Sequence, residues 1–358
     1  MRIDQLIPAF HRGDAIGDTA AHLRTSLRAR GFDANIYCLN HDPELAGEAR
    51  LFADFPPPAA GDVTILHFAL PSPLTDGLLR LPSRKFIIYH NITPPEFFAP
   101  YNAEMARLCR IGREELARLA PRIEAGLADS EYNRLELEAL GVRTTREFPL
   151  HVDFAKYERP ASAFVRRLFE DGRTNILFVG RIVPNKRIED LIKVVFYYKK
   201  YVSPLVRLVV VGKTSSLPAY YRALVRMSDE FYLKPEEITF AGHVPDEEMY
   251  ALYLASHVFL SLSEHEGFCL PLIESMVFDL PIVAYDSTAV PYTLAGAGVL
   301  LKDKRVDRAA ELVDIVAKDG ALRETVIAGQ RRRLAAFKAA QEEAFLFREF
   351  EPLLRSRR

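Results

Sequence analysis

The chain has 358 residues, of which 49% are hydrophobic and 27% are charged. At roughly 100–200 residues per domain this length favours two domains, and the composition excludes a long disordered or collagen-like tract. Lys and Arg number 47 against 48 Asp and Glu, for a formal net charge of -1. That balance disfavours a nucleic-acid binder with a global basic surface, so no nucleic-acid partner is expected.

The cysteines and the first residues of the chain indicate a reducing compartment. Cys38, Cys109 and Cys269 lie far apart and form no Cys-x2-Cys pair, which argues against a disulfide framework and against a zinc site. The chain opens without a basic stretch followed by an apolar run, and no window holds 18 uninterrupted apolar residues. We predict a cytoplasmic protein, with any membrane contact peripheral and at the inner membrane face.

Apolar runs of strand length recur along the chain, each followed by polar turn residues and a helical pattern. They lie at residues 3–8, 34–39, 63–68, 85–89, 176–179, 207–211, 238–241, 258–262 and 281–284. Continuous rather than alternating apolar strands indicate burial on both faces, as in parallel sheets covered by helices. The predicted fold class is therefore α/β, with two Rossmann-like, doubly wound parallel-sheet domains whose ligand-binding edges face a cleft.

A polar, turn-rich stretch at residues 151–175 separates the two groups of strands, as a domain linker does. We place an N-terminal domain at 1–155, a second domain at 156–335, and a C-terminal helix at 336–358 that packs back towards the N-terminal domain. The end of the chain reads as one or two helices. Its expected apolar anchors are Leu334, Phe337, Phe345, Phe347 and Phe350.

The densest chemical signal runs from Ser263 to Glu274, directly after an apolar strand. Pro271 suits the first position of a helix, and the amides before it would form an anion site at the helix N-terminus. Glu266 lies at the mouth of this turn and Glu274 about one turn into the helix. This arrangement suits a ligand with hydroxyls on both sides of a phosphate, such as a nucleotide sugar. The alternative is an ordinary strand-to-helix connection with acidic residues near the helix start.

A second signal begins where a buried strand ends in Gly180. Arg181 follows at once and Lys186 comes five positions later, in a Pro-Asn turn. Cations at the carboxyl end of a parallel strand can supply the clamp and the point charge that a diphosphate needs. Taken singly, they are ordinary surface cations.

Together the two motifs resemble the donor-binding half of the family-4 retaining glycosyltransferases, which have the two-Rossmann GT-B fold. The shared pattern is Gly-Arg-x4-Lys followed by Glu-Gly-Phe-x-Leu-Pro-x2-Glu, and the match continues through residues 240–244, 247–253 and 281–284. It covers most of the second domain. The resemblance implies that the donor is bound by Gly180, Val244, Gly267, Phe268, Cys269, Leu270 and Glu274.

The N-terminal domain resembles the same family through less specific motifs. Gly17 would lie in the glycine-containing loop that approaches the donor phosphates, before a helix beginning near Thr19. His90 stands where the family places an active-site histidine, at the end of a buried strand; read alone, it is a hydrogen-bonded structural residue. We assign the acceptor to Asp18, Asn91, Thr93 and Asn133.

The sequence departs from the family pattern at three positions. Cys269 and Asp279 stand where the family usually has Gly, and Tyr292 stands where Glu often follows the Pro. Tyr292 puts the local helix cap or ribose contact in doubt. None of the three removes an identified ligand group.

The resemblance implies transfer of a sugar from a nucleoside-diphosphate sugar to a hydroxyl of a glycan or lipid-linked acceptor, in cell-surface polysaccharide or glycolipid synthesis. Retention would follow from front-face displacement, with His90, Arg181, Lys186 and Glu266 as the catalytic residues and no protein nucleophile. No Asp-x-Asp pair occurs in the sequence, so we predict no metal and no other cofactor. The alternatives are a nucleotide-sugar-binding homologue without turnover and a GT-B epimerase. The sugar, the base, the acceptor and the oligomeric state stay open.

Overall fold

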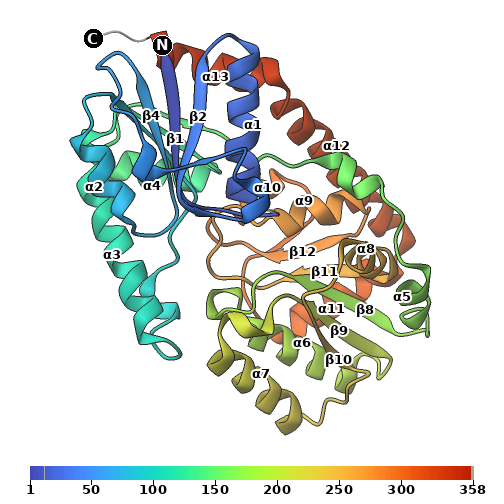
Figure 1. Ribbon diagram of the computed structural model, residues 1–358. Helices are drawn as coiled ribbons and strands as arrows, with labels where there is room; N and C mark the ends of the chain where they lie inside the picture. Colours follow the sequence, from blue (N-terminus) through green and yellow to red (C-terminus); the bar gives the residue numbers. More distant parts are fainter. Residues whose placement is uncertain (12, 356–358) are drawn as a thin grey trace. The chain divides into compact units, whose positions relative to one another are not determined.

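The computed structural model describes residues 1–11 and 13–355, without the side chains of residues 343–346 and 349. The expected anchor Phe345 and the last three residues of the predicted C-terminal segment therefore lie outside the described residues. The chain divides into two compact units (Figure 1). Unit 1 comprises Met1–Pro95, Glu104–Asp153 and the chain from Lys338 on, and unit 2 comprises Glu96–Ala103 and Phe154–Phe337.

Unit 1 contains a seven-stranded sheet in the order β3-β2-β1-β4-β5-β6-β7, and every neighbouring pair is parallel. Its strands are β1 (Arg2–Phe10), β2 (Asp33–His41), β3 (Arg50–Leu51), β4 (Val63–Phe68), β5 (Arg84–Tyr89), β6 (Ala125–Ala128) and β7 (Thr145–Glu147). Its α-helices are α1 (Ala15–Ala29), α2 (Pro73–Arg80), α3 (Ala103–Leu119), α4 (Glu131–Ala139) and α13 (Glu343–Arg355). Short 3₁₀ helices occur at Pro43–Leu45, Phe52–Asp54 and Ala120–Arg122, and a further one, Pro95–Phe97, continues into the Glu96–Ala103 segment of unit 2.

Unit 2 contains a six-stranded parallel sheet in the order β10-β9-β8-β11-β12-β13. Its strands are β8 (Thr174–Val179), β9 (Val206–Val211), β10 (Ile238–Gly242), β11 (Val258–Ser261), β12 (Ile282–Tyr285) and β13 (Val299–Leu301). Its α-helices are α5 (Ala163–Leu168), α6 (Ile188–Tyr201), α7 (Pro218–Glu230), α8 (Asp246–Ala255), α9 (Leu270–Val277), α10 (Val290–Leu294), α11 (Val306–Lys318) and α12 (Gly320–Ala340). The 3₁₀ helices are η5 (Phe154–Glu158), η6 (Pro184–Lys186) and η7 (Thr214–Ser216).

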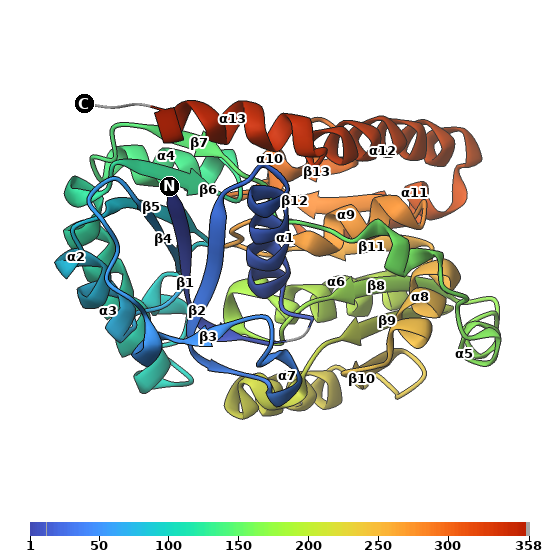
Figure 2. The same ribbon diagram turned by 45° about the horizontal axis from the view of Figure 1, so that its top comes forward.

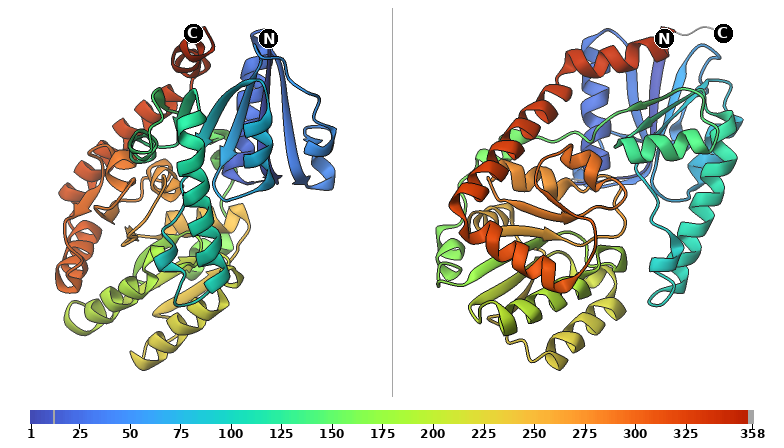
Figure 3. Two further views of the ribbon diagram at one scale, coloured as in Figure 1. Left: turned by 90° about the vertical axis from the view of Figure 1, so that its left-hand side faces the viewer. Right: turned by 180° about the vertical axis from the view of Figure 1, so that it is seen from behind.

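Helices cover both faces of each sheet (Figures 2 and 3), which is why the central strands are mostly buried. Every residue of β4 and of β9 is buried. In both sheets the strand order steps outward in two directions from a pair of central strands, β1 and β4 in unit 1 and β8 and β11 in unit 2. The predicted fold class of two doubly wound parallel-sheet units is confirmed. Such sheets gather loops, and hence ligands, at the carboxyl ends of their strands.

The last helix of the chain belongs to the core of unit 1. Phe347, Phe350 and Leu353 of α13 pack in one buried cluster with Phe86 of β5. The Arg84 guanidinium donates to the backbone carbonyls of Leu353 and Leu354, at 2.6 Å each.

Two predicted helix starts are wrong. Helix α1 begins at Ala15 rather than near Thr19, so Gly17 and Asp18 lie in its first turn and not in a loop. A Cβ on Gly17 would stand 3.1 Å from the carbonyl oxygen of His11, so glycine lets this turn approach the end of β1. Helix α9 begins at Leu270, and Pro271 is its second residue rather than its first.

Candidate functional site

The carboxyl ends of β8 and β9 approach each other through glycine. Gly180 donates its N–H to the carbonyl of Val211 at 3.0 Å, and Gly212 donates to the carbonyl of Gly242 at 2.8 Å. A Cβ on Gly212 would lie 1.9 Å from the carbonyl oxygen of Gly180, which no side chain allows. Gly180 itself has φ +157. Because these glycines carry no side chains, the loops that follow β8 and β9 can pack against each other at the edge of the sheet.

The loops after β8 and β11 are joined at that edge by Asn185. The N–H of Glu264 donates to the Asn185 carbonyl at 2.9 Å, and the Asn185 side-chain amide donates to the carbonyl of His265 at 2.8 Å. Because Asn185 is only 2% exposed, these bonds are shielded from water. They fix the relative position of Lys186 and Glu266, which the sequence assigns to the same ligand.

Lys186 and Glu266 form an ion pair. The side chain of Lys186 is 15% exposed and that of Glu266 is 5% exposed, so both charges are largely removed from water. The backbone N–H of Glu266 donates to the hydroxyl of Thr288 at 2.8 Å, which ties this turn to the loop after β12. The structure therefore brings together three strand-end loops around one cation and one carboxylate.

A second ionic cluster stiffens the outer side of these loops. Arg187, in a left-handed conformation with φ +52, pairs with Glu264 at 3.0 Å. Lys304 pairs with both Glu264 and Asp190. Networked charges of this kind hold geometry better than isolated surface pairs.

The turn before α9 passes through Cys269, whose φ is +71. This backbone region is open to glycine and costly for other residues, which explains why the related family usually has Gly here. The Cys269 thiol donates a hydrogen bond to the Glu266 carboxylate. Burial, and after it the negative charge of Glu266, raises the pKa of the thiol well above its ordinary value. Asp279, the other position where Gly is usual, likewise has φ +52.

Glu274 lies inside α9 and is 6% exposed. One carboxylate oxygen accepts from the Tyr157 hydroxyl at 2.8 Å and the other from the Tyr253 hydroxyl at 2.9 Å. Burial, followed by the charge of Glu274, raises the pKa of Tyr253 well above its ordinary range, so the phenol stays a donor. No described contact joins Glu274 to Lys186 or Glu266. Each carboxylate oxygen keeps a further lone pair for a ligand.

The remaining donor-site candidates of unit 2 follow the carboxyl ends of β8, β10 and β11. Arg181 is exposed and has no ion-pair partner within residues 13–355. Val244 is partly buried between β10 and α8, Gly267 and Leu270 are partly buried, and Phe268 is buried. The carbonyl of Phe268 accepts from the Thr293 hydroxyl at 2.5 Å.

In unit 1, both ring nitrogens of His90 are engaged. Nδ1 lies 3.0 Å from each carboxylate oxygen of Asp129, and Nε2 lies 3.0 Å from Nδ1 of His67. Nε2 of His67 lies 2.9 Å from the side-chain oxygen of Gln5. The His90 side chain is 2% exposed. Sequence reasoning missed the three partners, although polar residues inside continuous apolar strands are a usable signal.

The acceptor candidates of unit 1 divide into two groups. The Asn91 side chain, at φ +74, donates to the Asn133 side-chain oxygen at 2.7 Å, and the Asn133 N–H donates to Ser130, the N-cap of α4. These contacts fix the loop after β5. Thr93 is partly buried in that loop, while Asp18 lies apart from it in the first turn of α1.

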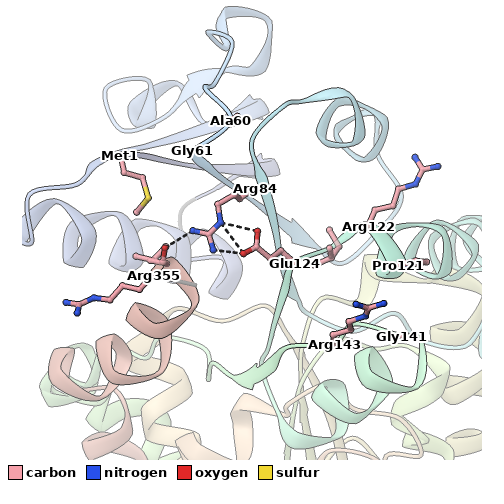
Figure 4. Close-up of a pocket in the computed structure, with 12 residues that line it drawn as sticks. Met1, Ala60, Gly61, Arg84, Pro121, Arg122, Glu124, Gly141, Arg143 and Arg355 are labelled. Atoms are coloured by element: carbon pink, nitrogen blue, oxygen red, sulfur yellow. Dashed lines mark hydrogen bonds and ion pairs between the residues drawn. The ribbon is translucent and has the colours of Figure 1, made fainter. Parts of the chain in front are cut away.

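A cavity of ≈ 880 Å³ lies at the opposite, amino edge of the unit 1 sheet (Figure 4). At its centre Arg84 pairs with both oxygens of Glu124, at 3.1 and 3.0 Å, and donates to two carbonyls of α13. Its donors are used within the protein. Arg122 and Arg143 line the cavity, but their side chains do not converge on a common point (Figure 4). We place the functional site at the carboxyl edges instead.

The described residues hold neither a metal-ligand cluster nor a membrane-spanning helix. Over residues 1–11 and 13–355, no group of three or more His, Cys, Asp or Glu side chains is arranged to hold a metal ion. Within the same residues, none of the helices is both long and apolar enough to cross a membrane.

The second half of the chain is similar to known glycosyltransferases. Residues 162–333 match the family Glycosyl transferases group 1. The chain is 28% identical over 232 residues to a GDP-mannose-dependent alpha-mannosyltransferase of Mycobacterium tuberculosis, covering 63% of this chain and 56% of that protein. It is 37% identical over 70 residues to an O-antigen chain mannosyltransferase B of Escherichia coli, which is 20% of this chain and 18% of that one.

Solved structures share the fold over nearly the whole chain. Sucrose-phosphate synthase from Thermosynechococcus elongatus has a TM-score of 0.73 at 18% identity and covers 98% of this chain and 100% of its own. HepE from Anabaena, solved in complex with UDP-glucose, has a TM-score of 0.71 at 15% identity and covers 99% of both chains. The fold is GT-B, and residues 162–333, within unit 2, match the glycosyl transferases group 1 family.

Proposed function

We propose that the protein is a retaining glycosyltransferase that moves a sugar from a nucleoside-diphosphate sugar to a hydroxyl acceptor. The observation that carries this proposal is the Lys186–Glu266 pair, held at the carboxyl edge of the unit 2 sheet by Asn185. An ammonium has three donors, so Lys186 can keep Glu266 and still donate to a phosphate oxygen. Exposed Arg181 supplies a second cation for the leaving diphosphate.

The proposed roles follow from charge development in the reaction. Negative charge grows on the diphosphate as the glycosidic bond breaks, and fixed cations and amides aimed at that charge lower the barrier. Lys186, Arg181 and the amides of Gly267 and Phe268 would stabilise it, and the departing phosphate oxygen would take the acceptor proton. Glu266 would bind hydroxyls of the sugar and Glu274 those of the ribose. Val244 would contact the base through its backbone.

We infer mannose as the transferred sugar. The support is that two relatives of the chain are mannosyltransferases, one of them GDP-mannose-dependent. The acceptor would be a glycan or lipid-linked glycan of a cell-surface polysaccharide, which suits a cytoplasmic enzyme at the inner membrane face. Unit 1 would bind this acceptor, with Asn91 and Thr93 in the loop after β5 and Asp18 at the start of α1.

A donor screen tests the proposal. GDP-mannose, UDP-glucose and UDP-N-acetylglucosamine are each incubated with the protein, with and without a mannosylated lipid acceptor, and nucleotide release is measured. Acceptor-stimulated release of GDP with an α-anomeric product by NMR is the expected result. Tight donor binding without release would favour a homologue that lacks turnover. Conversion of the free nucleotide sugar without an acceptor would favour an epimerase.

A further inference from the structure

A chain of buried polar side chains crosses four neighbouring strands of unit 1. Gln5 lies in β1, His67 in β4, His90 directly after β5 and Asp129 directly after β6. These strands are adjacent in the sheet order, so the four side chains meet although they come from widely separated parts of the sequence. Gln5 is 0% exposed, His67 1% and Asp129 4%.

The hydrogen bonds of this chain fix where each proton lies. The Gln5 amide donates to the carbonyl of Ala20 at 3.0 Å, so its oxygen faces His67 and can only accept. Nε2 of His67 therefore carries a hydrogen and donates to Gln5 across 2.9 Å. Burial, followed by the charge of His90, lowers the pKa of His67 well below its ordinary value. A neutral His67 then has a bare Nδ1.

Because Nδ1 of His67 carries no hydrogen, it can only accept a hydrogen bond from Nε2 of His90. Since the two rings are 3.0 Å apart at this bond, Nε2 of His90 must carry the hydrogen that His67 accepts. The remaining bond, from His90 Nδ1 to Asp129 at 3.0 Å, holds one proton shared between a nitrogen and a carboxyl. Burial raises the pKa of Asp129 from its ordinary value, which keeps that proton inside the pair.

We propose that Gln5, His67 and Asp129 are positioning residues that fix the orientation and the protonation of His90. Because Nδ1 is bonded to Asp129 and Nε2 donates to His67, neither ring nitrogen of His90 can serve as a general base. This inference rests on the proposed function only for its catalytic meaning. The backbone supports it, because the N–H of His90 donates to the carbonyl of Phe68 at 2.9 Å and so continues the strand ladder.

The test uses the full chain labelled with ¹⁵N-histidine and reads the ring nitrogens by long-range proton–nitrogen NMR. In the wild type we expect His67 as the neutral form protonated on Nε2, and His90 protonated on Nε2. Gln5→Met removes both side-chain hydrogen bonds of Gln5, the residue at the end of the row of polar side chains opposite to Asp129. The NMR signals of the His90 ring should therefore shift although Gln5 does not touch His90. Thr64→Val is the matched control. Thr64 lies in β4, as His67 does, and the substitution removes a buried hydroxyl that is hydrogen-bonded only to Ser83, at 2.7 Å, among the contacts described.

The outcomes separate this inference from the proposed function. Unchanged His90 signals in Gln5→Met, equal shifts in Thr64→Val, or a His67 ring protonated on Nδ1 would each overturn the inference. In an active enzyme, Asp129→Asn should lower kcat by tenfold or more with little change in KM. An unaltered kcat would show that Gln5, His67 and Asp129 have only a structural role and would refute positioning for catalysis. If no donor is turned over, the proposed function is wrong. The NMR experiment still shows which ring nitrogens of His67 and His90 carry hydrogens.

Discussion

Replacing Lys186 separates the stability of the site from its chemistry. Lys186→Met keeps the length of the side chain but leaves the Glu266 carboxylate, 5% exposed, with the Cys269 thiol as its remaining side-chain partner. Breaking a buried ion pair from one side costs about 3–5 kcal/mol. Because Lys186 is itself 15% exposed and the hydrogen bond to the thiol remains, we expect about 2–4 kcal/mol, which lowers Tm by about 4–16 °C in a domain of this size.

The assay combines thermal unfolding with donor turnover measured well below both melting points. Lys186→Met should lose about 10²–10³ in turnover, as removal of one group that stabilises developing charge does. Adding Glu266→Gln should recover most of the lost stability, because no unpaired charge stays buried, but none of the turnover. Lys193→Met is the control, since Lys193 is 41% exposed in its pair with Asp190 and should change neither quantity. An unchanged Tm in Lys186→Met, or recovered transfer in the double variant, would refute the reasoning.

Four further outcomes are expected. Glu274→Gln should weaken binding of the free nucleoside diphosphate by about tenfold or more, because a charged acceptor for the ribose is lost. Glu266→Gln should leave that affinity nearly intact while lowering transfer; equal losses in a calorimetric titration would contradict this division. Transfer should persist in excess EDTA, and activity that EDTA abolishes and Mg²⁺ restores would disprove the metal-free prediction. Burial lowers the pKa of His151 from 6.5 to about 4, so the unfolded chain binds this proton more readily. The stability that neutral His151 contributes is therefore complete above about pH 6.5 and is lost as the pH falls towards about 4. His151→Phe should flatten the fall in the denaturant midpoint over this range, and an unaltered fall would contradict the assignment.

The buried strands could be predicted because their signal is local. The run at 63–68 coincides with β4, since a strand covered on both faces is made mostly of apolar residues. β6 was missed because its sequence is Ala-Gly-Leu-Ala. A Cβ on Gly126 would stand 2.8 Å from the Leu137 side chain, so close packing of α4 requires small residues there and removes the hydrophobic signal that would reveal a strand.

The position of the candidate site could be predicted from the sequence, but the partners of its residues could not. Placement at carboxyl ends of parallel strands brought Lys186 and Glu266 to one edge from positions 80 residues apart, and the structure joins them in an ion pair. The partners of Glu274 were not predictable, because Tyr157 reaches it from a stretch that reads only as a polar linker. Nor was the engagement of both His90 nitrogens, which depends on the strand order rather than on any local pattern.

The packing of α13 on unit 1 has a consequence for biosynthesis. The chain leaves the ribosome from its amino end, yet the core around Phe86 is completed only by Phe350 and Leu353, and Arg84 finds its acceptors on α13 only then. Most of unit 2 is one uninterrupted stretch, Phe154–Phe337, and is translated in full before α13 appears. The core around Phe86 can therefore be completed only after residues Phe154–Phe337 of unit 2 have been translated.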